Sequence, residues 1–211
     1  MYKTEQENFW AGEFGDEYIE RNNCAEQFAS YLRFWSKIFK CSRSDIKSVI
    51  EFGANIGINL KAIKTLLPFV NLNAIEINKK ACEQLAKIVE GGAILNDSIL
   101  NAELNQKYNL IFTRGVLIHI NPDELDNIYE RMYKSTNDNG YIVIDEYYNP
   151  YPVSIDYRGE KDKLFKRDFA GELMNKYPSL ELIDYGFTYH RDGWNDDSNW
   201  FLMRKTVKSN A

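Results

Sequence analysis

The sequence predicts a one-domain α/β protein with a mostly parallel, seven-stranded sheet that has helices on both faces and ends in an antiparallel hairpin. Short apolar runs alternate with helical patterns from residue 48 to residue 147, as in parallel strands joined by helices. Several of these runs are apolar almost throughout, which is typical of strands buried on both faces. The last two runs, 180–192 and 199–205, are joined only by residues 193–198, too few for a crossover helix, so they should pair antiparallel.

Each element has its own signal. Residues 24–40 place apolar side chains three or four positions apart, which predicts a helix ahead of the first strand. A later helix should start at Asn121, with Pro122 at its first position and Glu124 at its third, a capping-box arrangement. The other expected strands are 48–53, 72–77, 92–97, 108–113 and 140–147, and the helices between them are 57–67, 78–89 and 121–136.

Composition narrows the function. A chain of 211 residues that is 44% hydrophobic has room for one domain with a sizeable core. Its net charge of -5 disfavours nucleic acid as the main partner, so a small molecule is expected. The three cysteines form no C-x-x-C pair and no ligand cluster demands a metal. No run suits a signal peptide or a membrane span, which predicts a cytoplasmic protein without a membrane partner.

The stretch "VIEFGANIG", residues 49–57, places an acid and two glycines at the first strand end, where ligands bind in open parallel sheets. Gly53 would let the chain turn sharply, and Gly57 would start the helix without a side chain that blocks a ligand. A dinucleotide turn would need glycine where Asn55 and Ile58 stand, and no P-loop lysine follows. The ligand is therefore expected to be nucleoside-like, without a diphosphate at this turn.

Acids end the next two strands. Glu76 lies roughly 20 residues after the turn, where an acid can bind both hydroxyls of a ribose. Asp97 ends the third strand, where it could accept a hydrogen bond from the exocyclic amine of a base. Acids and a glycine turn at successive strand ends form a stronger signal than any one glycine pair.

These motifs resemble those of a known family. "EFGANIG", "AIEIN", "LNDSI" and "LIFTRGVLIHI" are similar to the successive motifs of class I S-adenosylmethionine-dependent methyltransferases, over about residues 46–205. The resemblance implies a Rossmann-like fold, with S-adenosylmethionine as cofactor and S-adenosylhomocysteine as product. It divides the chain into a helical cap or lid at 1–45 and a core at 46–211, with a small acceptor-binding insertion at about 149–175.

A narrower likeness covers nearly the whole chain. "EQENFWAGEFGDEYIERN", "YRGEKDKLFKRDFAGE" and "NWFLMRK" resemble the small methylases associated with pseudaminic acid biosynthesis and other surface-glycan clusters. It implies methylation of a small acceptor in surface polysaccharide biosynthesis, such as an oxygen of a sugar, a nucleotide sugar or a phosphoryl precursor. The family name reflects genetic association, so the acceptor, the methylated atom, the oligomeric state and any assisting metal stay open.

The family roles, carried over to matching positions, assign the cofactor pocket. The methionine end would be shaped by Glu51, Gly53, Asn55 and Gly57; Glu76 would hold the ribose, Ile77 would flank the adenine, Asp97 and Ser98 would meet its edge, and Arg114 and Gly115 would form the floor. The aromatic residues Trp10 and Tyr18 either pack an N-terminal arm on the sheet or form a pocket lid, since aromatic faces attract a sulfonium cation. In that lid Arg21 could pair with the cofactor's carboxylate.

Catalytic and acceptor residues are expected beyond the later strands. If a hydroxyl is methylated, a base must take its proton: the first candidate is His119, which could equally be structural, followed by Asp145, Glu146 and Tyr148. Residues 157–168 hold five basic and three acidic residues, a run that is usually a solvated helix face but lies where this fold inserts its acceptor-binding part. An anionic acceptor would then meet Tyr157, Arg158, Lys163, Lys166, Arg167 and, in the hairpin loop, His190.

The sequence thus predicts a methyltransferase, with O-methylation preferred. A binding protein that keeps the cofactor site without transferase activity remains an alternative. A nicotinamide oxidoreductase would share the sheet, but the glycine spacing argues against it.

Overall fold

The computed structural model describes residues 2–21, 28–42, 46–193 and 196–207. The described α-helices are α1 (Glu5–Ala11), α2 (Glu13–Arg21), α3 (Phe28–Cys41), α4 (Ile58–Leu66), α5 (Lys79–Leu85), α6 (Leu125–Ser135) and α7 (Phe169–Lys176). The described strands are β1 (Ser48–Phe52), β2 (Asn71–Ile75), β3 (Ile94–Leu95), β4 (Tyr108–Arg114), β5 (Thr136–Glu146), β6 (Val153–Tyr157), β7 (Glu160–Lys166), β8 (Leu180–Thr188) and β9 (Ser198–Lys205). Short 3-10 helices occur at η2 (Leu117–His119), η3 (Pro122–Glu124) and η4 (His190–Asp192).

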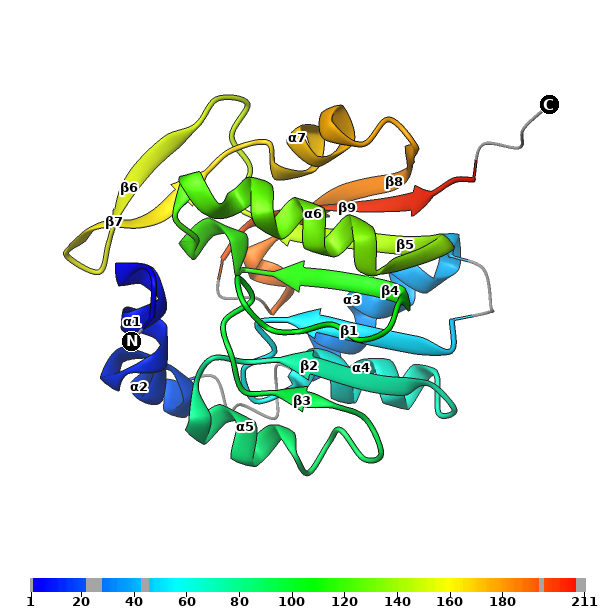
Figure 1. The fold of residues 1–211 in the computed structure, drawn as a ribbon, viewed down its shortest axis with the longest axis horizontal. Coiled ribbons are helices and arrows are strands. Elements are labelled where there is room, and N and C mark those ends of the chain that lie inside the picture. The colour runs from blue at the N-terminus through cyan, green and yellow to red at the C-terminus, as the bar shows by residue number, and fades with distance from the viewer. Residues whose placement is uncertain (1, 22–27, 43–45, 194–195, 208–211) are drawn as a thin grey trace.

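The main sheet has seven strands in the order β3-β2-β1-β4-β5-β9-β8 (Figure 1). The pairs from β3 to β5 are parallel, and β9 is antiparallel to both β5 and β8. The predicted α/β fold with its terminal antiparallel hairpin is confirmed. The chain passes from β1 to β2 on one side and later returns to β4 on the other, so the strand order reverses at β1. At such a reversal a crevice opens beyond the carboxyl ends of the strands.

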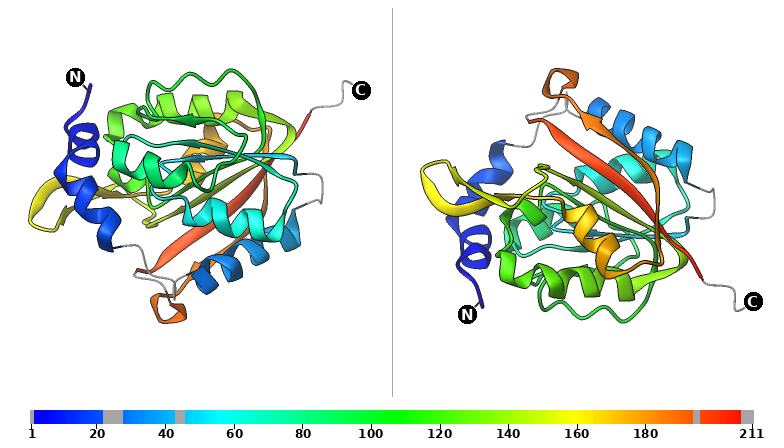
Figure 2. Two further views of the ribbon diagram at one scale, coloured as in Figure 1. Left: turned by 90° about the horizontal axis from the view of Figure 1, so that it is seen from below. Right: turned by 90° about the horizontal axis from the view of Figure 1, so that it is seen from above.

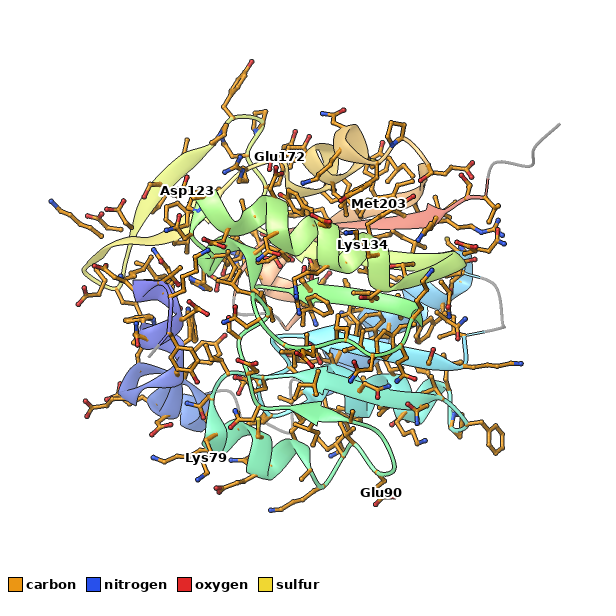
Figure 3. All side chains as sticks on the ribbon, viewed as in Figure 1. Lys79, Glu90, Asp123, Lys134, Glu172 and Met203 are labelled. Carbon is orange, nitrogen blue, oxygen red and sulfur yellow. The ribbon has the colours of Figure 1, made fainter. Side chains whose placement is uncertain are left out.

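Helices cover both faces of this sheet (Figure 2). On one face α3 and α4 pack with Trp35 fully buried between helix and strands. On the other face α6 and α7 pack over a cluster that includes Met203 of β9 (Figure 3). The sheet is therefore the middle layer, and the carboxyl edge of its strands is the place where loops can build a site.

The predicted cap at 1–45 divides into two parts. Helices α1 and α2 lie at the carboxyl edge of the strands, outside the sheet (Figure 1). Asp16 of α2 holds them to the core, because it accepts a hydrogen bond of 2.9 Å from Asn78 at the start of α5. In contrast α3 packs on the sheet through Phe34 and Trp35, so it belongs to the core. We refer to α1 and α2 as the cap, because they lie over the ends of the strands (Figure 1).

The predicted insertion at about 149–175 contains a β-hairpin. Strands β6 and β7 pair antiparallel as a separate two-stranded sheet, and α7 follows them. The interpretation of 157–168 as a solvated helix face is therefore wrong. Arg158 and Gly159 form the turn with φ values of 50° and 86°, which are left-handed values suited to a tight hairpin turn. The inner strand β7 lies against η2, which brings the insertion to the edge of the crevice.

Some element boundaries differ from prediction. The helix expected at 121–136 begins as η3, and Asn121 accepts a hydrogen bond of 3.0 Å from Asp123. Glu124 pairs with Lys3 of the N-terminal arm, so the predicted capping box does not form. The strand expected at 92–97 is reduced to the two residues of β3. No helix in the described part of the chain is long and apolar enough to cross a membrane.

Candidate active site

A cleft opens at the carboxyl ends of β1, β2 and β4, under helices α1 and α2. It holds about 1080 Å³ of space, its open mouth included. Most of the predicted cofactor residues meet here, although they come from separate parts of the chain. The predicted residues that line the cleft are Trp10, Tyr18, Glu51, Gly53, Asn55, Gly57, Glu76, Ile77, Ser98, Arg114, Gly115 and His119.

The turn after β1 bends through three left-handed residues, Gly53, Asn55 and Gly57, with φ values of 77°, 47° and 80°. The backbone N–H of Gly53 donates to the carbonyl of Ile75 across 2.9 Å, which ties the turn to β2. A Cβ on Gly57 would lie 2.5 Å from Leu85 of α5. Glycine is thus required there by its φ angle and by helix packing, rather than by the open ligand side that was expected.

Glu51 is 1% exposed at the end of β1. Its Oε1 accepts a hydrogen bond of 2.7 Å from the side-chain amide of Asn59, whereas its Oε2 is buried without a partner among the described residues. Burial raises the pKa of this carboxyl well above its usual value, against a smaller opposing effect of the Asn59 hydrogen bond. The cleft therefore contains a buried acceptor oxygen that a ligand donor could satisfy.

Arg114 forms the opposite wall with a buried network. Its Nε donates to Asp145 across 2.7 Å and one terminal nitrogen donates to Asn59 across 3.2 Å, while the guanidinium lies over Tyr31 and Phe34. Asn59 also accepts from Trp35, so one amide connects Glu51 to Arg114. The sequence analysis did not identify Asn59, because its role depends on neighbours that only the fold brings together.

Glu76 is 7% exposed and closes the gap between the glycine turn and α5. Its two oxygens accept backbone hydrogen bonds from Asn55 (2.6 Å) and Asn78 (2.7 Å). Burial raises its pKa, and these hydrogen bonds oppose the rise. Each carboxylate oxygen has a second lone pair, so Glu76 can still accept from a ligand in the cleft.

The third strand end contributes less than predicted. Ser98 is buried and lines the cleft. Asp97 accepts a hydrogen bond of 2.7 Å from the Ser98 backbone, but it is only half-buried and is not among the lining residues. Ile77 lines the cleft between Glu76 and Asn78.

His119 ends η2 and is 6% exposed. Its Nδ1 lies 2.7 Å from the backbone carbonyl oxygen of Lys163 on β7. The centre of its ring lies 4.7 Å from the ring centre of Trp10 and 4.9 Å from that of Tyr157. A carbonyl only accepts, so Nδ1 carries the proton and the lone pair of the neutral ring is on Nε2. Burial lowers the pKa of His119 to about 4. The ring is therefore neutral at physiological pH.

The other predicted catalytic residues do not line the cleft. Asp145 is held by Arg114, and Glu146 accepts backbone hydrogen bonds from Val116 (3.1 Å) and Ile118 (3.3 Å). Burial raises the pKa of Glu146 to about 7. Its carboxyl group thus braces the segment that carries His119. Tyr148 is 41% exposed and borders a separate small hollow near Phe201.

The predicted acceptor residues are scattered. Tyr157 touches His119, as described, and the side chain of Arg158 lies 5.6 Å from that tyrosine's ring centre. The three other basic residues have partners elsewhere: Lys163 pairs with Glu5, Lys166 lies over Tyr147, and Arg167 pairs with Glu172 (labelled in Figure 3). His190 lies in η4, 2.9 Å from Asp197, and is not among the cleft residues.

The cap closes the cleft from outside with Trp10 and Tyr18, whose rings meet edge to face at 5.1 Å. Arg21 ends α2, but its side chain lies outside the described residues. Three further cap residues, Gln6, Glu7 and Gly15, also line the cleft. The spacing of Thr4 and Glu7 in the sequence is that of a capping box, and the structure contains this capping box at the start of α1.

Neither a protein-family model nor a curated protein matches this sequence. Solved structures do match. The 1,6-didemethyltoxoflavin N1-methyltransferase of Burkholderia thailandensis, solved with S-adenosylhomocysteine, is 12% identical with a TM-score of 0.69, covering 96% of this chain and 87% of that one. An O-methyltransferase of a Brevibacillus brevis polyketide multienzyme, also with S-adenosylhomocysteine, is 14% identical with a TM-score of 0.65, covering 98% and 81%.

A third match is an amino pentose methyltransferase of calicheamicin biosynthesis from Micromonospora echinaspora, solved with S-adenosylmethionine. It is 12% identical with a TM-score of 0.65, covering 92% of this chain and 96% of that one. Such low identities establish the fold alone. The chain has the Rossmann-like fold of the class I S-adenosylmethionine-dependent methyltransferases.

Proposed function

We propose that the protein is an S-adenosylmethionine-dependent methyltransferase that acts on a small molecule. The observation that carries this proposal is the buried Oε2 of Glu51, which has no hydrogen-bond partner among the residues that the structure describes. It lies beside a left-handed turn and one strand away from Glu76. The cofactor-bound methyltransferases described above have the same fold. The glycine turn and the two acids at the strand ends suit a ligand in which a nucleoside is joined to an amino acid, as in S-adenosylmethionine.

The residues fit this cofactor by their chemistry. Glu51 offers an acceptor oxygen for the ammonium of the methionine part, and Glu76 offers lone pairs for the ribose hydroxyls. A Cβ on Gly115 would meet no atom within 4 Å, so the backbone leaves open space on that wall. The aromatic rings of Trp10 and Tyr18 suit a sulfonium cation.

When bound, the cofactor supplies an electrophilic methyl group on sulfur. The contribution of the protein is to hold the acceptor in line with that methyl, which can supply about 7–11 kcal/mol of the barrier. The cap and the β6–β7 hairpin would exclude water from the acceptor side of the cleft. Gln6 of α1 donates 3.0 Å to the carbonyl of Asp162 in the hairpin, so the two segments meet.

We propose His119 as the base for a hydroxyl acceptor. With its Nδ1 proton bound to the Lys163 carbonyl, the ring has its lone pair on Nε2 and can accept the hydroxyl proton as the new bond forms. Glu146 would act as a positioning residue, because it binds the backbone ahead of His119.

For the acceptor we propose an oxygen of a sugar, a nucleotide sugar or a phosphoryl precursor in surface polysaccharide biosynthesis. The support is the resemblance noted in the sequence and the insertion beside His119. Arg158 at the hairpin turn and Lys166 on β7 are the basic residues we propose for an anionic group, since Lys163 and Arg167 already have carboxylate partners. We further propose a cytoplasmic location, which the free thiols of Cys41 and Cys82 favour.

Calorimetry with S-adenosylmethionine, S-adenosylhomocysteine and NAD tests the cofactor. We expect heat with the first two only; binding of NAD alone would overturn the proposal in favour of an oxidoreductase. Release of S-adenosylhomocysteine with a panel of nucleotide sugars, phosphorylated sugars and aminosugars then tests transfer. Methylation of a nitrogen would refute the proposed O-methylation, and binding without any turnover would favour a cofactor-binding protein.

A further inference from the structure

Glu7 of the cap is a buried cleft residue to which no role has been assigned so far. It is 4% exposed, and its Oε2 accepts hydrogen bonds from the backbone N (2.7 Å) and the hydroxyl (3.0 Å) of Thr4. Its Oε1 is buried without a hydrogen-bond partner among the described residues. Leaving a buried carboxylate oxygen unpaired is costly, and such a group in a native structure calls for an explanation. A donor on the ligand is the simplest one, because Glu7 lines the cleft.

The first residues of the chain relate Glu7 both to the segment after β4 and to the side of the cleft where Glu76 lies. Lys3 pairs with Glu124 in η3, so the start of α1 lies against the loop that follows β4. The pKa of Tyr2 is raised first by burial and then by the negative charges of Asp97, Glu7 and, less strongly, Glu76. Tyr2 therefore lies on the same side of the molecule as Glu7, Cys82 and the ends of β2 and β3. Glu76 is the residue proposed for the ribose, and the sequence relates Asp97 to the edge of the base.

We propose that Oε1 of Glu7 accepts a hydrogen bond from the 6-amino group of the cofactor's adenine. This inference rests on the proposed function and assigns one subsite of the same cleft. A 6-amino group carries two N–H donors, and Glu7 would accept one of them, while Glu76 is used by the ribose. A carboxylate at this place also rejects a 6-oxo purine, whose oxygen would face a negative charge. The cap would then contribute directly to purine specificity.

The variant Glu7→Gln isolates this oxygen. Glutamine also completes a capping box, so α1 keeps its N-terminal cap, while the free oxygen is replaced by an N–H donor. Glu13→Gln is the matched control, because Glu13 carries the same charge on the cap but is exposed and outside the cleft. Calorimetry would measure the Kd of S-adenosylhomocysteine and of S-inosylhomocysteine, its 6-oxo analogue, for all three proteins.

We expect Glu7→Gln to weaken S-adenosylhomocysteine binding about 10- to 100-fold, the loss typical of a hydrogen bond to a charged group. We also expect it to narrow the preference for adenine over hypoxanthine, since the amide can donate to the 6-oxo group. Glu13→Gln should match the wild type.

Two results would overturn this inference but not the proposed function. The first is a Glu7→Gln protein that binds S-adenosylhomocysteine as tightly as the wild type does. The second is a Glu7→Gln protein in which the Kd values of both ligands rise by the same factor. If the wild type binds neither ligand, the proposed function fails and this inference fails with it. Thermal unfolding of the ligand-free proteins shows whether Glu7→Gln is folded. An unfolded variant would be replaced by Glu7→Asp, whose shorter side chain no longer reaches the 6-amino group and should weaken S-adenosylhomocysteine binding if the contact exists.

Discussion

His119 and Lys163 are joined by a hydrogen bond of 2.7 Å between the ring Nδ1 of the first and the backbone carbonyl of the second. The bond links the segment after β4 to the inserted hairpin, and it selects the tautomer with a lone pair on Nε2. Because burial lowers the ring's pKa to about 4, the base that we propose is unprotonated throughout the physiological pH range.

Replacement of His119 should slow catalysis without weakening cofactor binding. We expect His119→Ala and His119→Gln to lower kcat about 10²- to 10⁴-fold with a hydroxyl acceptor, the usual contribution of a positioned base. Glutamine can still donate to the Lys163 carbonyl, so a loss in both variants points to proton transfer rather than packing. Steady-state kinetics with saturating acceptor and calorimetry with S-adenosylhomocysteine make the measurement. Wild-type kcat in either variant would remove His119 as the base.

The same ring should make stability depend on pH. The pKa of His119 is about 4 in the folded protein and about 6.5 in an unfolded chain, so the unfolded state binds the proton first as the pH falls. The stability that the neutral His119 ring contributes to the folded protein is complete above about pH 6.5. As the pH falls toward 4, the free energy of unfolding decreases by about 3 kcal/mol in total. Buried carboxyls with raised pKa values, such as Glu146, change stability in the opposite direction.

The difference in unfolding free energy between wild type and His119→Gln isolates this effect from that of the carboxyls. Denaturant titrations at several pH values between 4 and 8 should show the difference shrinking as the pH falls. A difference that is the same at every pH would mean that the ring keeps an ordinary pKa.

Removal of the negative charge of Glu76 should weaken binding of the cofactor. Glu76→Gln loses one acceptor oxygen at a place where two backbone N–H groups and the proposed ribose all need one. We expect a Kd for S-adenosylhomocysteine at least about 10-fold higher, measured by calorimetry. Glu90→Gln, an exposed change of equal charge beyond α5, is the control and should leave the Kd unchanged. Equal affinity in both variants would refute the ribose assignment.

Two glycines should respond differently to alanine. Gly57→Ala must adopt a φ of 80° and also displace Leu85, so we expect a loss of about 2–4 kcal/mol in unfolding free energy. Gly115→Ala meets only its φ of 63°, which should cost about 1–2 kcal/mol, but it adds a methyl group to the cleft wall. Denaturant unfolding and calorimetry together test this. Equal stability losses would mean that α5 moves aside for the new methyl group.

Much of the lining of the cleft could be predicted from the sequence, for a geometric reason. Parallel strands present their carboxyl ends at one edge, so Glu51 and Glu76 had to come close once their strands were recognised. Asn59 could not be found in this way. Its value lies in the partners Trp35 and Arg114, which are distant in sequence and meet it only after folding.

The insertion was harder to predict. The side chains of β6 are exposed on both of its faces except at Tyr157, so no alternation of apolar residues marked it as a strand. The basic residues of 157–168 suggested an anion site, but Lys163 and Arg167 pair with acids from α1 and α7. Charge runs report composition, whereas a binding site depends on which charges remain without partners after folding.

The oxygens of Glu7 and Glu51 that have no hydrogen-bond partner in the described part of the chain have a consequence for the lifetime of the protein in the cell. A ligand that donates a hydrogen bond to either oxygen binds the folded state and not the unfolded one. Binding should therefore raise the free energy of unfolding, by about 2.7 kcal/mol at a ligand concentration 100 times the Kd. Degradation that proceeds through opened molecules slows when those molecules become rarer. The abundance of the protein would therefore follow the supply of its ligand, even with no change in synthesis.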